Sequence, residues 1–209
     1  MNKIFGPYLV TDSGLCLHHS LEDVVRLSAL GGVKLVQLRE KDKNTREFLE
    51  LAKKLIEVLR PFHVPLIIND RLDITLISGA DGIHLGQSDL PHTEARRFLG
   101  QNKIIGLSIE KKDDLINLEN ADALDYLGVS PVFSTPTKTD TKTPWGLDGL
   151  RWARRNTKLP LVAIGGINES NAKEVIQAGA DSIAVVSYLC SAKDPKFNAE
   201  TLNSCFSKR

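Results

Sequence analysis

The chain has 209 residues, of which 42% are hydrophobic and 25% charged, a composition that is typical of one globular domain and excludes a disordered chain. Its formal net charge is +1, from 27 Lys and Arg against 26 Asp and Glu, so no overall positive field attracts nucleic acid or an anionic membrane. We therefore expect neither partner, and any anion-binding site must be local.

The cysteines and the first residues indicate a reducing compartment. The 3 cysteines, Cys16, Cys190 and Cys205, are far apart and form no C-x-x-C pair, which indicates neither a disulfide framework nor a structural zinc site. The first ten residues lack the apolar stretch of a signal peptide, and no later run is long enough to span a bilayer. We expect a cytoplasmic protein with a single domain, residues 1–209.

Apolar, strand-like runs alternate with helix-period segments along the whole chain. Leu21, Val24 and Leu27 have the spacing of an amphipathic helix, and the same pattern recurs between residues 48 and 59. Glycines at positions 31, 32, 79, 100 and 179 follow helical patterns and precede strands, as helix C-caps do. In chain order the predicted strands are 8–10, 33–38, 65–68, 82–85, 104–107, 126–129, 161–164 and 183–186.

Strand followed by helix, repeated about eight times, predicts a single-domain α/β protein with the (β/α)8 TIM-barrel fold. The rival is an open, doubly wound parallel sheet. Against it, no G-x-G-x-x-G follows the first strand, where the sequence reads Val10-Thr11-Asp12-Ser13-Gly14. In a barrel the active site lies at the carboxyl ends of the strands, so polar residues at those ends are the candidates.

The second predicted strand ends in polar side chains at alternate positions. Gln37, Arg39 and Lys41 would share one face of an extended chain. Buried cations without a partner are costly, so an anionic, phosphorylated ligand is the expected partner. With Asn69 and Lys138, they could hold a diphosphate. The alternative is surface ion pairing with neighbouring acidic residues, and it explains Arg39 poorly because Leu38 demands the opposite face.

Two aspartates follow neighbouring predicted strands. Asp70 closes the third strand, and Asp89 follows the fourth. Two carboxylates at one rim suit Mg²⁺, which completes its octahedron with water and substrate phosphate. Helix capping explains Asp70 equally well, because Asp is a common N-cap residue. His84 lies near a strand end, and we expect it to have a structural role.

Two further segments carry candidate chemistry. Gly165-Gly166 after the seventh strand and Val186-Ser187 after the eighth could form a phosphate cup of exposed amides, although a Gly-Gly pair is often only a tight turn. The loop 134–144 is the longest we find, and it is either a mobile lid or a solvated connection. No Ser-His-Asp or Cys-His set is apparent, so covalent nucleophilic catalysis is not expected.

Taken together, these segments resemble one known family. The segments are Tyr8-Leu9-Val10-Thr11-Asp12, Gln37-Leu38-Arg39-Glu40-Lys41, Asn69-Asp70-Arg71, the stretch 81–89, Gly106-Leu107-Ser108, Thr135-Pro136-Thr137-Lys138 and Ala163-Ile164-Gly165-Gly166-Ile167. Over nearly the whole chain and in this order, they resemble the thiamine phosphate synthase family. The resemblance implies a transferase of thiamine biosynthesis with the TIM-barrel fold.

The resemblance also implies roles for matching residues. Gln37 and Ser108 would hold an aminopyrimidine, and Asp70 and Asp89 would be the Mg²⁺ ligands. The remaining substrate-binding residues would be Arg39, Lys41, Asn69 and Lys138 at the pyrimidine diphosphate, Thr135 and Thr137 at a thiazole, Gly165, Gly166, Val186 and Ser187 at its phosphate, and Leu38, Glu40 and Pro136 within the same motifs. Arg39, Lys41, Ser108 and Lys138 would be catalytic.

The implied reaction joins hydroxymethylpyrimidine diphosphate to a thiazole phosphate, giving thiamine phosphate and diphosphate. In the family's usual account, the carbon–oxygen bond breaks first, and the thiazole nitrogen captures the pyrimidine carbocation. Ser130 stands where the family commonly has glycine, and Ile109-Glu110 stands where Thr-His is more usual. Whether the thiazole carries a carboxylate, and whether the chain forms a homo-oligomer, stay open.

Two alternatives remain. Thiazole tautomerase-like proteins resemble this chain but usually lack the full diphosphate and metal set, and they carry a histidine where this chain has Pro131. A non-catalytic sensor of phosphorylated thiamine intermediates would have no need for two carboxylates beside an anion. Asp70, Asp89 and Lys138 therefore favour the synthase.

Overall fold

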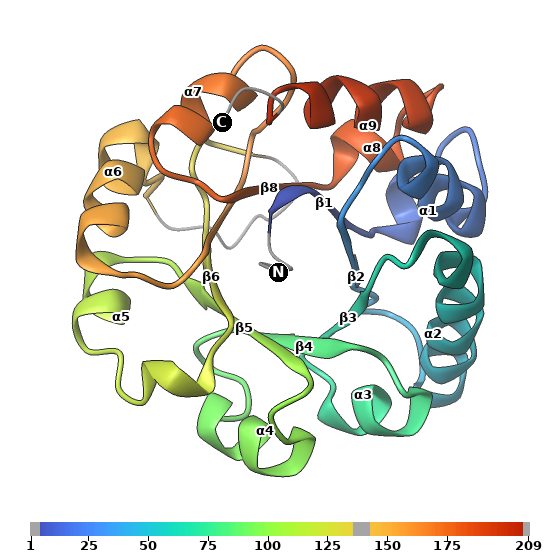
Figure 1. Ribbon diagram of the computed structural model, residues 1–209. Coiled ribbons are helices and arrows are strands. Elements are labelled where there is room, and N and C mark those ends of the chain that lie inside the picture. The colour runs from blue at the N-terminus through green and yellow to red at the C-terminus, as the bar shows by residue number, and fades with distance from the viewer. Residues whose placement is uncertain (1–4, 136–142, 207–209) are drawn as a thin grey trace.

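The computed structural model describes residues 5–135 and 143–206, and these residues form a closed parallel barrel surrounded by helices (Figure 1). The strands follow one another around the barrel in the order β1-β2-β3-β4-β5-β6-β7-β8. β1 closes the ring against β8, with Gly6 opposite Ser182 and Leu9 opposite Val185. The single-domain (β/α)8 prediction is thus confirmed, and the open doubly wound sheet is excluded.

The strands are short and connected by helices that lie outside the barrel (Figure 1). Their bounds are β1 Gly6–Val10, β2 Leu35–Leu38, β3 Leu66–Asn69, β4 Gly82–Leu85, β5 Ile104–Ile109, β6 Tyr126–Val129, β7 Leu161–Ile164 and β8 Ser182–Val185. The α-helices of the described residues are α1 Leu21–Leu30, α2 Thr45–Leu59, α3 Leu72–Ser78, α4 His92–Leu99, α5 Lys112–Ile116, α6 Gly146–Asn156, α7 Ala172–Gln177, α8 Ser187–Cys190 and α9 Pro195–Ser204.

Several predicted strand ends were wrong by one or two residues. β2 begins at Leu35 instead of position 33, because the N–H of Val33 bonds to the carbonyl of Ser28 in the turn after α1. β5 continues to Ile109, and β8 ends at Val185 instead of position 186. Val186 is therefore the first residue beyond β8, at the rim where a ligand would lie.

Local sequence explains where helices begin and end. Asn44 and Glu47 form a reciprocal capping box at the start of α2, in which each side chain accepts from the other's backbone N–H. Gly79 follows α3 with a φ of +80°, which glycine adopts without a Cβ penalty. No helix among the described residues is long and apolar enough to cross a membrane.

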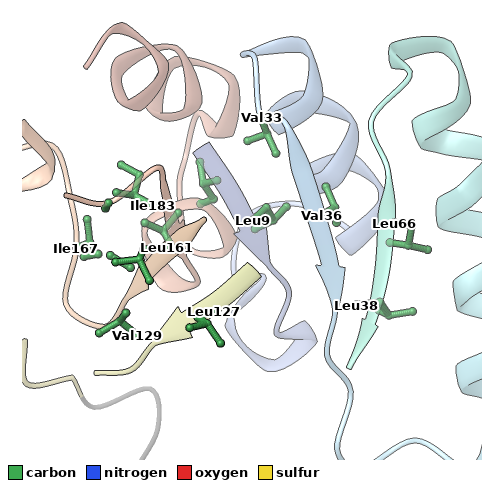
Figure 2. Packing of buried hydrophobic residues seen from close by; sticks show 14 of the residues in the cluster. Leu9, Val33, Val36, Leu38, Leu66, Leu127, Val129, Leu161, Ile167 and Ile183 are labelled. Carbon is green, nitrogen blue, oxygen red and sulfur yellow. The ribbon is translucent and has the colours of Figure 1, made fainter. Parts of the chain in front are cut away.

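The barrel has two apolar layers, because alternate side chains of each strand point inward and outward. The outward layer packs between strands and helices, and Figure 2 shows Leu9, Val36 and Leu38 among its members. The inward cluster fills the barrel below the rim, and its members are Tyr8, Val10, Leu35, Ile67, Ile104, Tyr126, Val162 and Ala184. Five of these residues, Tyr8, Val10, Tyr126, Val162 and Ala184, also line the cavity that opens at the rim.

Candidate active site

A cavity of about 930 Å³ lies at the carboxyl ends of the strands and receives lining residues from all eight strands or the turns after them. A cavity of this size and place matches the usual ligand site of the fold. The predicted residues that line it are Gln37, Arg39, Lys41, Asn69, Asp70, Asp89, Ser108, Thr135, Gly165, Gly166, Val186 and Ser187.

Two predicted substrate-binding residues lie elsewhere. The side chain of Leu38 is fully buried in the outward layer, because it alternates with Gln37 along β2 (Figure 2). Glu40 does not line the cavity, and its Oε1 accepts a hydrogen bond from Ser13 Oγ at 2.5 Å. Pro136, Thr137, Lys138 and most of the predicted lid loop lie outside the described residues.

The cationic part of the rim follows β2. The backbone N–H of Arg39 donates to Thr11 Oγ1 at 3.0 Å, and the N–H of Thr11 donates to the carbonyl of Gln37 at 2.9 Å. These bonds hold the end of β2 against the end of β1. Among the described residues neither Arg39 nor Lys41 forms an ion pair, so the neighbouring Glu40 and Asp42 do not pair with them, whereas Asp140 lies outside the described residues.

Asp70 has an unusual backbone for a residue with a side chain. Its φ is +63°, in the left-handed region, and its N–H donates to the carbonyl of His84 at 2.9 Å. The N-cap residue of α3 is Arg71, and no side chain caps that helix. Helix capping, the alternative interpretation of Asp70, is therefore wrong. The turn instead directs Asp70 into the cavity.

Asp70 and Asp89 are close enough to affect each other's charge. Burial, followed by a hydrogen bond with Asp89 and the like charge of Asp89, raises the pKa of Asp70 to about 6. Asp89 is held in place by the N–H of Gly86, which donates to its Oδ2 at 2.7 Å. Two ionised carboxylates this close repel each other unless a proton or a cation lies between them.

The donor set fits Mg²⁺. Within residues 5–135 and 143–206, no group of three or more His, Cys, Asp or Glu side chains could hold a metal ion. Magnesium commonly takes only one or two protein carboxylates and fills its other positions with water and phosphate oxygens. Asp70 and Asp89, which line the same cavity as Arg39 and Lys41, meet that requirement if a phosphorylated ligand is present.

The floor of the cavity is polar and was largely missed by sequence reasoning. Tyr8 and Tyr126 are fully buried, their hydroxyl oxygens lie 3.0 Å apart, and both line the cavity. His84, expected to be structural, contacts Tyr126 and Ser108 at 2.9 Å each. Tyr8 alternates with Leu9 and so shares the inward face of β1 with Val10, and this was the only hint in the sequence that Tyr8 faces the cavity. An aromatic residue in an apolar strand is, however, usually part of the hydrophobic core.

The glycine segment after β7 has backbone conformations that favour glycine. Gly165 and Gly166 have φ values of +107° and +65°, and Asn171 Nδ2 donates to the carbonyl of Gly166 at 2.9 Å. No backbone hydrogen bond from the N–H of Gly165 or Gly166 is found within the described ranges. Val186 and Ser187, at the start of α8, line the same cavity.

Comparison with known proteins places the chain among enzymes of one activity. A family model described as thiamine monophosphate synthase matches residues 7–189. A thiamine-phosphate synthase of Leptospira biflexa serovar Patoc is 63% identical over 208 residues, covering 98% of this chain and 99% of the relative. A thiamine-phosphate synthase of Albidiferax ferrireducens is 56% identical over 188 residues, covering 90% and 85%.

The comparison with solved structures supports the same family. A thiamine phosphate pyrophosphorylase from Pyrococcus furiosus superimposes with a TM-score of 0.86 at 35% identity, covering 99% of this chain and 97% of that structure. A 3-hexulose-6-phosphate synthase superimposes with a TM-score of 0.66 at 16% identity, which is a likeness of fold alone.

Proposed function

The chain belongs to the thiamine monophosphate synthase family and acts as a thiamine-phosphate synthase, a transferase, and from this premise we propose how the cavity performs the reaction. One observation supports the proposal above all others. A single cavity joins the cations Arg39 and Lys41, the carboxylates Asp70 and Asp89, and the glycine segment Gly165-Gly166. These are the parts needed to hold two phosphorylated substrates side by side.

The pyrimidine diphosphate occupies the part of the rim between β2 and β4. Arg39 binds its phosphate oxygens as a fork, Lys41 and Lys138 act as point charges, and Asn69 donates from its amide. Asp70 and Asp89 would hold Mg²⁺, which, when bound, neutralises charge on the departing diphosphate. Gln37 and Ser108 hold the pyrimidine ring deeper in the cavity.

The thiazole phosphate occupies the opposite part of the rim. The amides after β7 and at the start of α8 bind its phosphate, through Gly165, Gly166, Val186 and Ser187. Thr135 and Thr137 contact the thiazole ring. This arrangement presents the ring nitrogen to the pyrimidine methylene carbon.

The reaction needs positioning and charge stabilisation more than proton transfer. The carbon–oxygen bond to the diphosphate breaks, its electron pair leaves with the diphosphate, and the thiazole nitrogen supplies the pair for the new carbon–nitrogen bond. A ring nitrogen already has a free electron pair, so no general base is required. We propose four catalytic residues, Arg39, Lys41, Lys138 and Ser108. The three cations stabilise the negative charge that develops on the departing diphosphate.

The finer assignments complete the proposal. Residues 1–209 act as one domain in the cytoplasm, on small-molecule substrates and without nucleic acid, as the cysteine usage and net charge suggest. Leu38 and Glu40 contribute no side chain to the cavity and are left out of the binding set.

The proposal is tested by thiamine phosphate formation from the two purified substrates, with and without Mg²⁺. We expect magnesium-dependent product with the wild type and its near-complete loss in Asp70→Ala and Lys138→Ala. Product without Mg²⁺ would contradict the metal role of Asp70 and Asp89. Binding of thiazole phosphate without any product would instead favour a tautomerase-like enzyme or a sensor.

A further inference from the structure

Two cysteines that are far apart in the sequence meet beside the turn that follows β1. Cys16 comes directly after the short 3₁₀ helix Ser13–Leu15, and Cys190 is the last residue of α8. The Cys16 thiol donates to the carbonyl of Asp12 at 3.5 Å, and the Cys190 thiol donates to the carbonyl of Val10 at 3.8 Å. Both sulfur atoms therefore lie against the same short stretch of backbone.

The residues next to the two cysteines hold them side by side. Ser191, which follows Cys190, donates from its Oγ to the carbonyl of Leu15 at 3.0 Å, and Leu15 immediately precedes Cys16. This hydrogen bond ties the end of α8 to the turn after β1. The Cys190 thiol is also within hydrogen-bonding reach of the Cys16 sulfur. Two thiols in this position need only a small movement to be joined by a disulfide.

The two thiols differ in exposure and in acidity. Cys190 is buried, and its hydrogen bond to Cys16, followed by burial, raises its pKa, so this thiol stays protonated. Cys16 is only partly buried, and the hydrogen bond from Cys190 lowers its pKa. That effect outweighs burial and the negative charges of Glu40, Asp12 and Glu22, which act in the opposite direction. Because a thiolate is the nucleophile, Cys16 is the sulfur that reacts first.

We propose that Cys16 and Cys190 are a redox-active pair, which hydrogen peroxide oxidises reversibly to a disulfide that weakens the binding of thiazole phosphate. Neither cysteine lines the rim cavity, and neither takes part in the proposed reaction. In the reducing compartment that the cysteine usage suggests, the resting form is the dithiol. The disulfide forms only when an oxidant is present.

The oxidation proceeds in two steps that balance. The Cys16 thiolate attacks one oxygen of the peroxide, the oxygen–oxygen bond breaks, and hydroxide leaves with its electron pair and takes up the thiol proton to become water. Cys16 is then a sulfenic acid. The Cys190 sulfur attacks the Cys16 sulfur, the sulfur–oxygen bond breaks, and the leaving hydroxide takes the Cys190 proton to become a second water. The two thiols together lose two electrons, which reduce the peroxide.

Cys190 is connected to the residues that we propose to bind thiazole phosphate. Its backbone N–H donates to the carbonyl of Val186 at 2.9 Å, and only the 4-residue helix α8 separates it from the rim. A disulfide brings two sulfur atoms closer than a hydrogen bond does, so oxidation draws Cys190 towards Cys16. Val186 and Ser187 are then displaced with it. This consequence for binding rests on the proposed function, whereas formation of the disulfide does not.

The test treats the reduced protein with hydrogen peroxide and then measures both the disulfide and the activity. After digestion without reductant, mass spectrometry should detect the Cys16 and Cys190 peptides joined to each other. The KM for thiazole phosphate should rise about tenfold, and dithiothreitol should reverse both changes. Cys16→Ser, at a partly exposed position, should keep the KM of the reduced wild type and lose both responses to peroxide.

Cys205→Ser is the matched control, because Cys205 is also a partly buried thiol that donates to a backbone carbonyl, that of Thr201 at 3.5 Å. This variant should respond to peroxide as the wild type does. The inference would be overturned if the wild type gave no joined peptides, or if it gave them with a thiazole phosphate KM within twofold of the reduced enzyme. Failure of the reduced wild type to form thiamine phosphate would instead contradict the proposed function. Because the joined peptides are detected without any activity, the two failures are distinguishable.

Discussion

The two sides of the barrel rim offer different groups for the phosphate binding that we propose. On the side of β2 to β4, which we call the side-chain half, Arg39, Lys41, Asp70 and Asp89 supply formal charges. On the side of β7 and β8, the backbone half, Gly165 and Gly166 supply backbone amides in left-handed conformations. The first depends on charge and the second on the absence of a Cβ, so different substitutions should damage each half.

The largest effect is expected from removing one charge of the side-chain half. Asp70→Asn should lower the magnesium-dependent rate by about 10³-fold, because the carboxylate pair loses the charge that holds the metal beside the leaving diphosphate. Asn tolerates the φ of +63° at this position, so the backbone is kept. Initial rates over a Mg²⁺ titration measure the effect.

Asp73→Asn controls for the loss of a nearby carboxylate. Asp73 is exposed on α3 and pairs with Arg71 at 2.7 Å, and it does not line the cavity. Its substitution should leave the rate within twofold of the wild type, since its charge is screened by solvent. An equal loss of rate in Asp70→Asn and Asp73→Asn would mean that Asp70 supports the fold and does not hold the metal.

The backbone half should bind phosphate more weakly when a methyl group is added to one of its glycines. A Cβ on Gly166 would lie 2.9 Å from both Phe133 Cβ and the carbonyl oxygen of Ser134, in addition to the strain of its φ of +65°. Gly166→Ala should therefore displace the amides and raise the KM for thiazole phosphate about 100-fold. The KM for the pyrimidine diphosphate should hardly change.

Gly79→Ala is a control that introduces the backbone strain of a left-handed alanine without displacing any neighbouring atom. Gly79 has a φ of +80°, and a Cβ there would meet nothing within 4 Å. It should cost about 1–2 kcal/mol of stability, as a left-handed alanine does, and leave both KM values as they are. A similar rise of the thiazole phosphate KM in both variants would show that the cup at Gly166 has no special role.

A smaller effect is expected where the charge is kept and only its shape changes. Arg39→Lys retains the cation but loses the fork that binds two phosphate oxygens at once, so the KM for the pyrimidine diphosphate should rise about tenfold. Arg46→Lys on the exposed surface of α2 is the control and should behave as the wild type. An unchanged KM in Arg39→Lys would mean that the side-chain half needs charge alone.

The side-chain half was largely predictable from sequence, because strand alternation applies before the fold is known. Polar residues at 37, 39 and 41 interrupt an apolar run, and the closed barrel brings them to the cavity. The same alternation places Leu38 in the outward layer, and counting the whole motif as substrate-binding ignored it. Lys138 stays a prediction, since it lies outside the described residues.

The floor could not be predicted in this way. Tyr8 and Tyr126 are 118 positions apart, and neither differs locally from a core aromatic residue. Only closure of the barrel brings their hydroxyls together, and only then does His84 acquire partners at both ring nitrogens. Likewise, nothing in the local sequence indicated the left-handed turn at Asp70, which decides between helix capping and a place in the cavity.

The smallest expected effect is on the free energy of unfolding. It tests whether the ionised carboxylates of the side-chain half destabilise the metal-free protein. The folded protein raises the pKa of Asp70 to about 6, above its ordinary value, so it binds that proton more tightly than the unfolded chain does. The resulting stabilisation is complete below about pH 4 and is lost as the pH rises through 6. A shift of this size corresponds to about 3 kcal/mol for a fully buried group. The carboxyl of Asp70 is partly desolvated in the cavity, but the residue as a whole still reaches solvent, so we expect about 1 kcal/mol.

Asp70→Asn cannot ionise and should therefore gain about 1 kcal/mol over the metal-free wild type between pH 4 and pH 7.5, measured by urea unfolding. Asp73→Asn should show the opposite sign, because a hydrogen bond from Arg71 lowers the pKa of Asp73 and that stabilisation is present at high pH. Added Mg²⁺ should stabilise the wild type at pH 7.5 and leave Asp70→Asn unchanged. A pH-independent difference between Asp70→Asn and the wild type would mean that the metal-free fold does not raise the pKa of Asp70, either by burial or by the charge of Asp89. The side-chain half would then be as indifferent to ionisation as the backbone half.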